Sequence, residues 1–478
     1  MNTGRRVLKN FLSLSISEAA SRLAGIVLTI YIARTLGAGV FGQLSFVLAL
    51  VAFFNIFADF GLTTLGIREI AKDKFRTNTY GTNILVLQLG LSLILLLILF
   101  LVVLIIPLDP RIKLITFLFG LGMIPGALNM SYIFQAHEKM EYFAISKIIA
   151  QISYAIFGFV LIYLFRDILV LPIVNLTALF VAAGVTFYLL RKQINFVWSK
   201  ISLKNIVLLS KQTLPFLVAT LMVQIYMSTD SVMLQFMKGE EVVGLYNAAY
   251  KISFLLLLIS GFINGAIFPL MSVAYKKNRE YFSKLIKFYA RILGLFIIPI
   301  AIGGFIFAKE IIILLYGQSY TGGILALSIL IFVPVFMFIN TALGSALISS
   351  GNERIVMNST IVAATLNVVL NFLLIPSYSL YGAAVATIIA QIATFVYCYF
   401  AQRIILKIDI LSIYFFKPLV ASFLMATVLY YLPANLFLLT KVGIGALIYV
   451  IILFMLKGIQ LSDIYLIRQV LSKSKTTV

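Results

Sequence analysis

The stretch TNILVLQLGLSLILLLILFLVVLII, residues 82–106, decides the fold class of this chain. It contains no charged residue, and as an α-helix it is long enough to cross a bilayer, which takes about 20 apolar residues. Its apolar residues do not alternate with polar ones, as the strands of a transmembrane barrel would require. The stretch therefore predicts a membrane-spanning helix.

The composition of the whole chain points the same way. Of the 478 residues, 62% are hydrophobic and 11% are charged, whereas a soluble domain has about 25% charged residues. The 16 acidic and 37 basic side chains are too few to cover the polar surfaces of a soluble protein of this length. The composition excludes a soluble enzyme and a disordered chain, and it indicates an integral membrane protein.

Further apolar stretches of similar length lie on both sides of residues 82–106. The predicted spans are 11–33, 40–62, 82–106, 112–136, 142–165, 168–190, 213–236, 244–271, 287–308, 322–349, 355–375, 381–402, 414–433 and 437–456. The sequence thus predicts an all-α integral membrane protein with about fourteen transmembrane helices.

The distribution of Lys and Arg predicts the orientation. With a cytoplasmic N-terminus, most of the 37 basic residues fall in segments on the cytoplasmic side, as the positive-inside rule expects. Both termini are then cytoplasmic, and the protein is expected in the cell membrane, with its basic loops against anionic membrane lipids. The same rule explains the net charge of +21, so nucleic acid is not expected as a partner.

The spans divide into two lobes of six helices. The predicted organisation is an N-lobe at 1–196, a cytoplasmic amphipathic linker at 197–212, a C-lobe at 213–408, and two further spans with a cytoplasmic tail at 409–478. Lobes with an even number of spans share one topology, so the two lobes are expected to be related by an axis along the membrane normal. The segment VFGQL at 40–44 faintly resembles VVGLY at 242–246, each following the first span of its lobe.

Common catalytic and cofactor motifs do not explain the chain. Gly37–Gly42 spells GxGxxG, but it joins two membrane helices rather than a strand and a helix, so a tight turn is the better interpretation. The single histidine (His137) and single cysteine (Cys398) predict neither a metal site nor a disulfide. No metal and no bound cofactor are expected.

Ionisable residues inside the predicted spans are the strongest candidates for function, because each costs a few kcal/mol in the bilayer. They are Glu18, Arg22, Asp59, Asp230 and Lys251. One hypothesis is structural, with Glu18–Arg22 and Asp230–Lys251 as ion pairs. The other is a polar lumen, in which Arg22 and Lys251 bind an anion and Glu18, Asp59 or Asp230 carries a coupling proton or sodium ion.

Amide side chains form a second set of candidates inside the spans. They are Asn55, Asn264, Asn340, Asn367 and Asn371. Hydrogen bonds between helices are one interpretation. Contacts with a sugar or with a lipid head group are the alternative, which would make these residues part of a substrate cavity.

Several segments, taken in their order along the chain, resemble a known family. They are LGAGVFG at 36–42, FADFGLTTLGIREIA at 57–71, LLYGQSYTGGILALSIL at 314–330, ALISSGNERIVMNSTIVAATLNVVLNFLLIP at 346–376 and LYGAAVATIIAQ at 380–391. Together they resemble the polysaccharide-transport family, the Wzx-like O-antigen-flippase branch of the MOP superfamily of multidrug, oligosaccharidyl-lipid and polysaccharide exporters.

The resemblance implies two six-helix lobes around a cleft, and movement of a polyprenyl-linked oligosaccharide from the inner to the outer leaflet by ion-coupled alternating access. It also implies a cationic lumen for the carrier's phosphate, glycan-assembly enzymes as partners, and a place for Arg68 and Glu69 at the inner mouth, as gate or structural pair. The alternatives are a multidrug or small-molecule antiporter of the same superfamily and, in another class, a membrane-embedded glycosyltransferase or polysaccharide polymerase.

Overall fold

The computed structural model describes residues 3–191, 201, 203–410, 413–433 and 436–458, and every regular element in them is helical. Eleven helical segments of this part of the chain are long and apolar enough to cross a membrane, and the shorter helix Phe416–Tyr430 is also apolar. The prediction of an all-α, multi-pass membrane protein is confirmed. The count of fourteen spans and the side on which the termini lie stay predictions.

Two of these segments are too long for one crossing. Ser17–Lys72 has 56 residues and Glu353–Leu406 has 54, which at 1.5 Å per residue is about 80 Å against about 30 Å of hydrocarbon. The first is broken at Gly37, with φ 82°, and the second at Ser379, with φ 54°. Each break falls between two predicted spans, so each segment corresponds to a pair of them.

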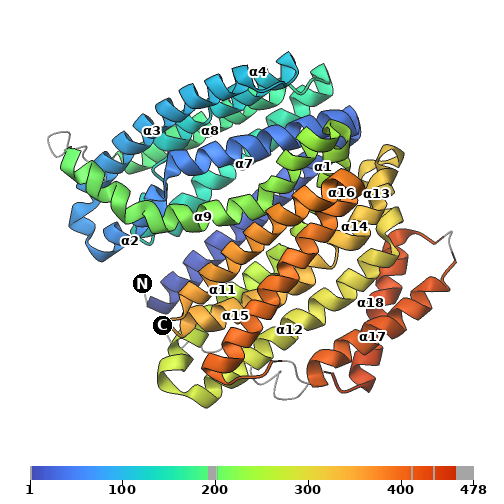
Figure 1. Ribbon diagram of the computed structural model, residues 1–478. Helices are drawn as coiled ribbons and strands as arrows, with labels where there is room; N and C mark the ends of the chain where they lie inside the picture. The colour runs from blue at the N-terminus through green and yellow to red at the C-terminus, as the bar shows by residue number, and fades with distance from the viewer. Residues whose placement is uncertain (1–2, 192–200, 202, 411–412, 434–435, 459–478) are drawn as a thin grey trace. The chain divides into compact units, whose positions relative to one another are not determined.

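The chain forms two compact units: Arg6–Gly244 make up the first, and the residues from Leu245 onward, together with the first five residues, make up the second. The helices of the first unit (Figure 1) are α1 (Thr3–Asp59), α2 (Leu62–Lys72), η1 (Lys74–Arg76), α3 (Thr77–Ile105), α4 (Pro110–Gly120), α5 (Met123–Leu128), α6 (Tyr132–Ala136), α7 (Met140–Phe165), α8 (Val170–Leu190) and α9 (Leu203–Lys238). In this unit α7 packs along α8, and α2 packs against α3, α6 and α9.

The second unit holds the rest of the described chain, and α10 crosses from one unit into the other. Its elements are α10 (Glu240–Leu255), α11 (Leu257–Lys277), α12 (Arg279–Ile306), α13 (Ala308–Tyr316), η3 (Gln318–Gly323), α14 (Ile324–Leu330), α15 (Val333–Ser349), α16 (Glu353–Leu406), α17 (Ile413–Tyr430) and α18 (Leu438–Met455). Its core forms where α12 packs against α11, α15 and α17.

Helix α3 shows how lipid replaces water as the outer solvent. Thr82, Asn83 and Gln88 are buried, whereas Leu97 and Leu104 on the same helix are 60% and 56% exposed. In water this distribution would be unfavourable, since polar groups would lose solvent and leucines would face it. In hydrocarbon the polar groups need partners inside the protein, and the leucines meet lipid.

Segment 63–81, which lies between the predicted spans 40–62 and 82–106, is largely helical. Helix α2 buries Leu62, Leu65 and Ile70, whose spacing places them on one face, where they pack beside Tyr132. Part of the predicted amphipathic linker, residues 197–200 and 202, lies outside the described residues, as does the tail from 459 onward. Helix α9 begins at Leu203, inside the linker, and continues through the next predicted span.

A close crossing joins the turn after the break of α1 to the start of α10. A Cβ on Gly42 would lie 1.7 Å from the carbonyl oxygen of Glu240, and one on Gly244 would lie 1.9 Å from that of Ala38. The two contacts are reciprocal, and Gly37 and Gly239 precede them with similar positive φ angles of 82° and 88°. This geometry supports the faint similarity between residues 40–44 and 242–246.

The turn between α1 and α2 is organised by Asp59. Its carboxylate accepts hydrogen bonds from the backbone N–H groups of Gly61, at 3.1 Å, and Thr63, at 3.3 Å. The Thr63 hydroxyl and the Gln88 amide, at 2.9 Å, also donate to it. Asp59 therefore satisfies donors at the start of α2 and ties that turn to α3.

The crossing predicts that Gly42→Ala destabilises the protein. An added methyl group would overlap the Glu240 carbonyl, and overpacking of this kind costs about 1–3 kcal/mol. We expect a lower midpoint of thermal unfolding in detergent micelles. Gly90→Ala is the matched control, since no heavy atom lies within 4 Å of its added Cβ. Equal stability of the two variants would contradict the crossing.

The Asp59 contacts predict that Asp59→Ala loosens the start of α2. Removing the carboxylate leaves several donors without their partner, which costs about 1–3 kcal/mol. Hydrogen–deuterium exchange should become faster at the amides of Gly61 and Thr63. Asp73→Ala removes a similar but exposed cap, at Phe75, and should accelerate exchange only locally. Unchanged exchange at Gly61 and Thr63 would show that the carboxylate does not hold this turn.

Candidate functional site

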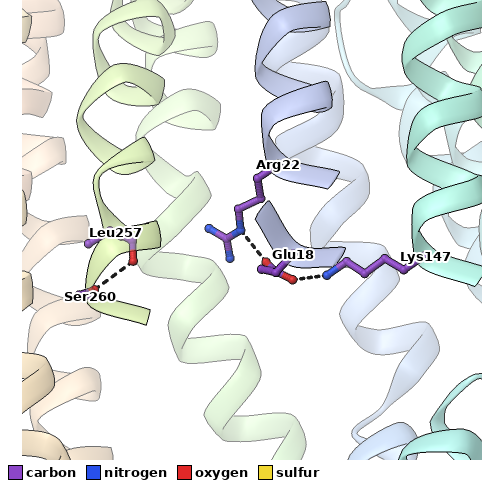
Figure 2. Close-up of polar contacts among 5 residues, drawn as sticks. All are labelled: Glu18, Arg22, Lys147, Leu257 and Ser260. Carbon is purple, nitrogen blue, oxygen red and sulfur yellow. Dashed lines mark hydrogen bonds and ion pairs between the residues drawn. The ribbon is translucent and has the colours of Figure 1, made fainter. Parts of the chain in front are cut away.

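A cluster of three charged side chains connects α1 and α7 in the first unit. Glu18 accepts a hydrogen bond from Arg22 Nε at 2.6 Å through one oxygen, and its other oxygen pairs with Lys147 Nζ. Glu18 and Arg22 lie on one face of α1 because they are four residues apart. Lys147 reaches the same carboxylate from α7 (Figure 2). The cluster has one negative and two positive charges.

The two cations of this cluster keep access to further ligands. The Arg22 side chain is 52% exposed and the Lys147 side chain 36% exposed, against 34% for Glu18. The bond from Arg22 uses Nε, and Figure 2 shows the terminal nitrogens of its guanidinium pointing away from α1. Because guanidinium nitrogens suit the paired oxygens of phosphate or carboxylate, the cluster can bind an anion.

Lys147 is the member of the cluster that sequence reasoning missed. It falls inside the predicted span 142–165, near the end where that span begins. Spans 11–33 and 142–165 both start on the predicted cytoplasmic side, and Glu18 and Lys147 each lie near that end. A comparison of depth would have suggested this pair, but only the packed structure shows that the two side chains meet.

The remaining candidate charges lie elsewhere. Asp59 is engaged at the start of α2, as described above. Asp230, on α9, is 1% exposed and belongs to the first unit, whereas the half-buried Lys251, on α10, belongs to the second. Their pairing stays a prediction.

The two gate candidates lie on α2. Glu69 pairs there with Lys72 at 2.7 Å and with Arg68 at 3.5 Å, so the gate candidates form a local ion-pair group.

Two of the candidate amides form hydrogen bonds between helices of the second unit. Asn264 Oδ1 accepts from the hydroxyls of Tyr289, at 3.0 Å, and Ser345, at 2.6 Å. Asn340 Nδ2 donates to Gln391 Oε1 at 3.1 Å. These contacts fit the interpretation that membrane-embedded amides join helices.

The other amides differ in their surroundings. Asn367 and Asn371 are fully buried on α16, where Asn371 Nδ2 donates to Asn367 Oδ1 at 3.1 Å. Asn55, on α1, is exposed. Contact of any of the five amides with a substrate stays a prediction.

An apolar groove lies inside the second unit. It has a volume of about 660 Å³ and is lined by α10, α12, α13, α17 and α18, with Phe296, Ile300, Leu429 and Val450 among its residues. Tyr449 also lines it, but its hydroxyl donates to the Leu295 carbonyl at 2.9 Å. Such a lining suits a hydrocarbon chain rather than a polar ligand.

Models of two known protein families match parts of this chain. The family model described as "Polysaccharide biosynthesis protein" matches residues 7–275, and the MatE model matches residues 215–373. A Shigella dysenteriae protein named as an O-antigen transporter is 25% identical over 394 residues, covering 80% of this chain and 97% of that protein. A Haloferax volcanii protein named as a glycan biosynthesis flippase is 28% identical over 146 residues, 30% of this chain and 31% of that protein.

A solved structure shares the fold. The lipid II flippase MurJ, in an inward closed conformation, superposes with a TM-score of 0.76 at 17% identity, covering 92% of this chain and 97% of that one. The comparisons confirm a multi-pass transport protein of the cell membrane. Because the first family model covers more than half of the sequence, the chain belongs to the polysaccharide biosynthesis protein family.

Proposed function

We propose that the protein is a flippase that moves a polyprenyl-(di)phosphate-linked oligosaccharide from the inner to the outer leaflet of the cell membrane. The single observation that carries this proposal is the exposed pair of cations, Arg22 and Lys147, on membrane-embedded helices of a chain in a polysaccharide biosynthesis family. Cations at this depth are costly unless they serve a partner or a ligand. The names of the O-antigen transporter and the glycan flippase support the same substrate class.

The substrate presents three chemistries, and the chain offers a partner for each. An oligosaccharide cannot cross hydrocarbon unaided, because its hydroxyls would lose water without replacement. The amides and hydroxyls of the spans would replace water, and Arg22 and Lys251 are each candidates to attract the phosphate. The apolar groove of the second unit would hold part of the carrier's hydrocarbon chain. In this mechanism no covalent bond is made or broken.

The mechanism that we propose is alternating access coupled to a proton or sodium gradient. Glu18, Asp59 and Asp230 are the candidate coupling groups, since each is an acid within a span. Arg68 and Glu69 are candidates for the inner gate. Enzymes that assemble the glycan are the expected partners, because they supply the substrate on one side and use it on the other.

A multidrug antiporter is the second candidate, favoured by the MatE match over residues 215–373. A lumen for cationic drugs would favour acids, whereas the cluster on α1 and α7 has an excess of positive charge. Drug accumulation assays in cells with and without the protein distinguish the two candidates, since only the antiporter would lower drug accumulation.

Loss of the protein should leave the lipid-linked glycan on the cytoplasmic side. A membrane-impermeant probe of the sugar should label it in inverted vesicles and not in intact cells or spheroplasts. Restoring the wild-type gene should return an outer-leaflet pool. An outer pool of normal size in cells that lack the protein would contradict the flippase assignment.

Arg22→Ala and Lys251→Ala should each lower transport at least tenfold, because each removes a cation proposed to meet the phosphate, and one charge-assisted contact corresponds to about 1.5–3 kcal/mol. The assay is outer-leaflet labelling, normalised to the amount of protein in the membrane. Lys284→Ala is the control, since Lys284 forms an exposed pair with Glu280 on α12. Unchanged transport in the double variant would make both charges structural.

A further inference from the structure

Pro299, inside α12, removes one backbone hydrogen bond beside the apolar groove of the second unit. In a regular helix the N–H of residue 299 would donate to the carbonyl of Leu295, four residues earlier, but proline has no N–H. Both residues line the groove. A backbone carbonyl that faces hydrocarbon must find a donor inside the protein, so this carbonyl needs a partner from outside its own helix.

Tyr449, on α18, supplies that partner. Its hydroxyl donates to the Leu295 carbonyl oxygen at 2.9 Å, and the side chain is buried where it lines the groove. Neighbouring helices commonly satisfy the groups that proline leaves free in membrane helices. Here the satisfied carbonyl belongs to a groove whose other lining residues are apolar.

The groove is open at one side and closed at the other. Phe296 of α12 and Val450 of α18 are 52% and 56% exposed, whereas Met425 and Leu429 of α17 are 3% and 4% exposed. A hydrocarbon chain can therefore enter between α12 and α18 and lie against α17. Gly303 adds room, because a Cβ placed on it would meet no heavy atom within 4 Å.

We propose that Tyr449 is a positioning residue that keeps the groove apolar, by taking up the carbonyl that Pro299 leaves free, and so allows the carrier's hydrocarbon chain to bind there. The inference rests on the proposed flippase function, which places part of that chain in the groove. It adds a role for α17 and α18, which lie beyond the two six-helix lobes predicted from the sequence.

Loss of the hydroxyl changes the polarity of the groove and leaves its shape nearly the same. Tyr449→Phe keeps the aromatic ring, but the Leu295 carbonyl then faces the groove without a donor. Such a carbonyl holds water, and a hydrocarbon chain that displaces this water offers no hydrogen bond in return. The chain therefore binds less tightly to the variant.

The need for Tyr449 depends on Pro299. Pro299→Ala restores an N–H that can donate to the Leu295 carbonyl within α12. In that background the hydroxyl is no longer required, so Tyr449→Phe should have little further effect on chain binding. A contact that only held α18 against α12 would cost the same in both backgrounds, and a double-mutant cycle distinguishes the two cases.

The test follows a hydrocarbon chain in the groove with a tryptophan reporter. Trp198 is the single tryptophan of the chain, so Trp198→Phe gives a background without tryptophan. Phe296→Trp then places the reporter at the groove, and the full chain is reconstituted in phosphatidylcholine vesicles. The probe is a polyprenyl monophosphate with a brominated chain, since bromine quenches tryptophan fluorescence only at close approach.

We expect the probe to quench the reporter with saturation. Tyr449→Phe should raise the probe concentration at half-maximal quenching at least about fivefold. Pro299→Ala with Tyr449→Phe should stay within about twofold of Pro299→Ala alone. Tyr381→Phe is the matched control and should leave the value unchanged, since its hydroxyl also donates to a backbone carbonyl, that of Gly322 at 3.1 Å, but does not line the groove.

A blocked groove shows where the quenching occurs. Gly303→Leu places a larger side chain in the open space of the groove and should abolish saturable quenching. Saturable quenching that survives this substitution would mean that the probe binds elsewhere, which overturns the inference.

The remaining outcomes separate the inference from the proposed function. Equal values for the reporter protein with and without Tyr449→Phe, or the same loss in both backgrounds, overturn the inference and leave the flippase assignment intact. A reporter that the probe does not quench, or that brominated phosphatidylcholine quenches equally at the same mole fraction, removes the carrier's chain from the groove and overturns that part of the proposed function as well. A Tyr449→Phe protein that folds only together with Pro299→Ala supports the dependence, and one that folds in neither background contradicts it.

Discussion

The structure depends on one constraint: a polar group placed in hydrocarbon must find its partner inside the protein. Helices meet this constraint for the backbone, which explains why every regular element of the described chain is a helix. For side chains the constraint determines which faces pack inward. Helix α3 buries Thr82 and Gln88 and turns Leu97 outward, because lipid can solvate a leucine but cannot solvate an amide.

The same constraint gives most candidate polar residues a structural partner. Asp59 accepts four hydrogen bonds at the junction of α1, α2 and α3, and Asn264 accepts two across helices. These contacts hold neighbouring helices together. The cluster of Glu18, Arg22 and Lys147 differs, since its cations are partly exposed and share a single carboxylate.

The glycine crossing shows a second way in which the bilayer environment shapes packing. Where backbones approach closely, side chains cannot fit between them, so Gly42 and Gly244 are required by the carbonyls of Glu240 and Ala38. Small residues at helix contacts are typical in membranes, where close packing replaces the hydrophobic effect as the force between helices. The reciprocal arrangement of these two contacts also relates the segment after Gly37 to the segment after Gly239.

The sequence by itself determined the fold class and the approximate positions of apolar spans, because each crossing needs about 20 apolar residues. The family followed from the resemblance of several segments taken in their order along the chain. The sequence also located Glu18 and Arg22 on one face of a helix, since that follows from helical spacing. Only the tertiary structure decided that Lys147 completes this cluster and that segment 63–81 is helical. The physical reason is that lipid-facing and protein-facing positions are both apolar, so hydropathy does not specify which helices become neighbours.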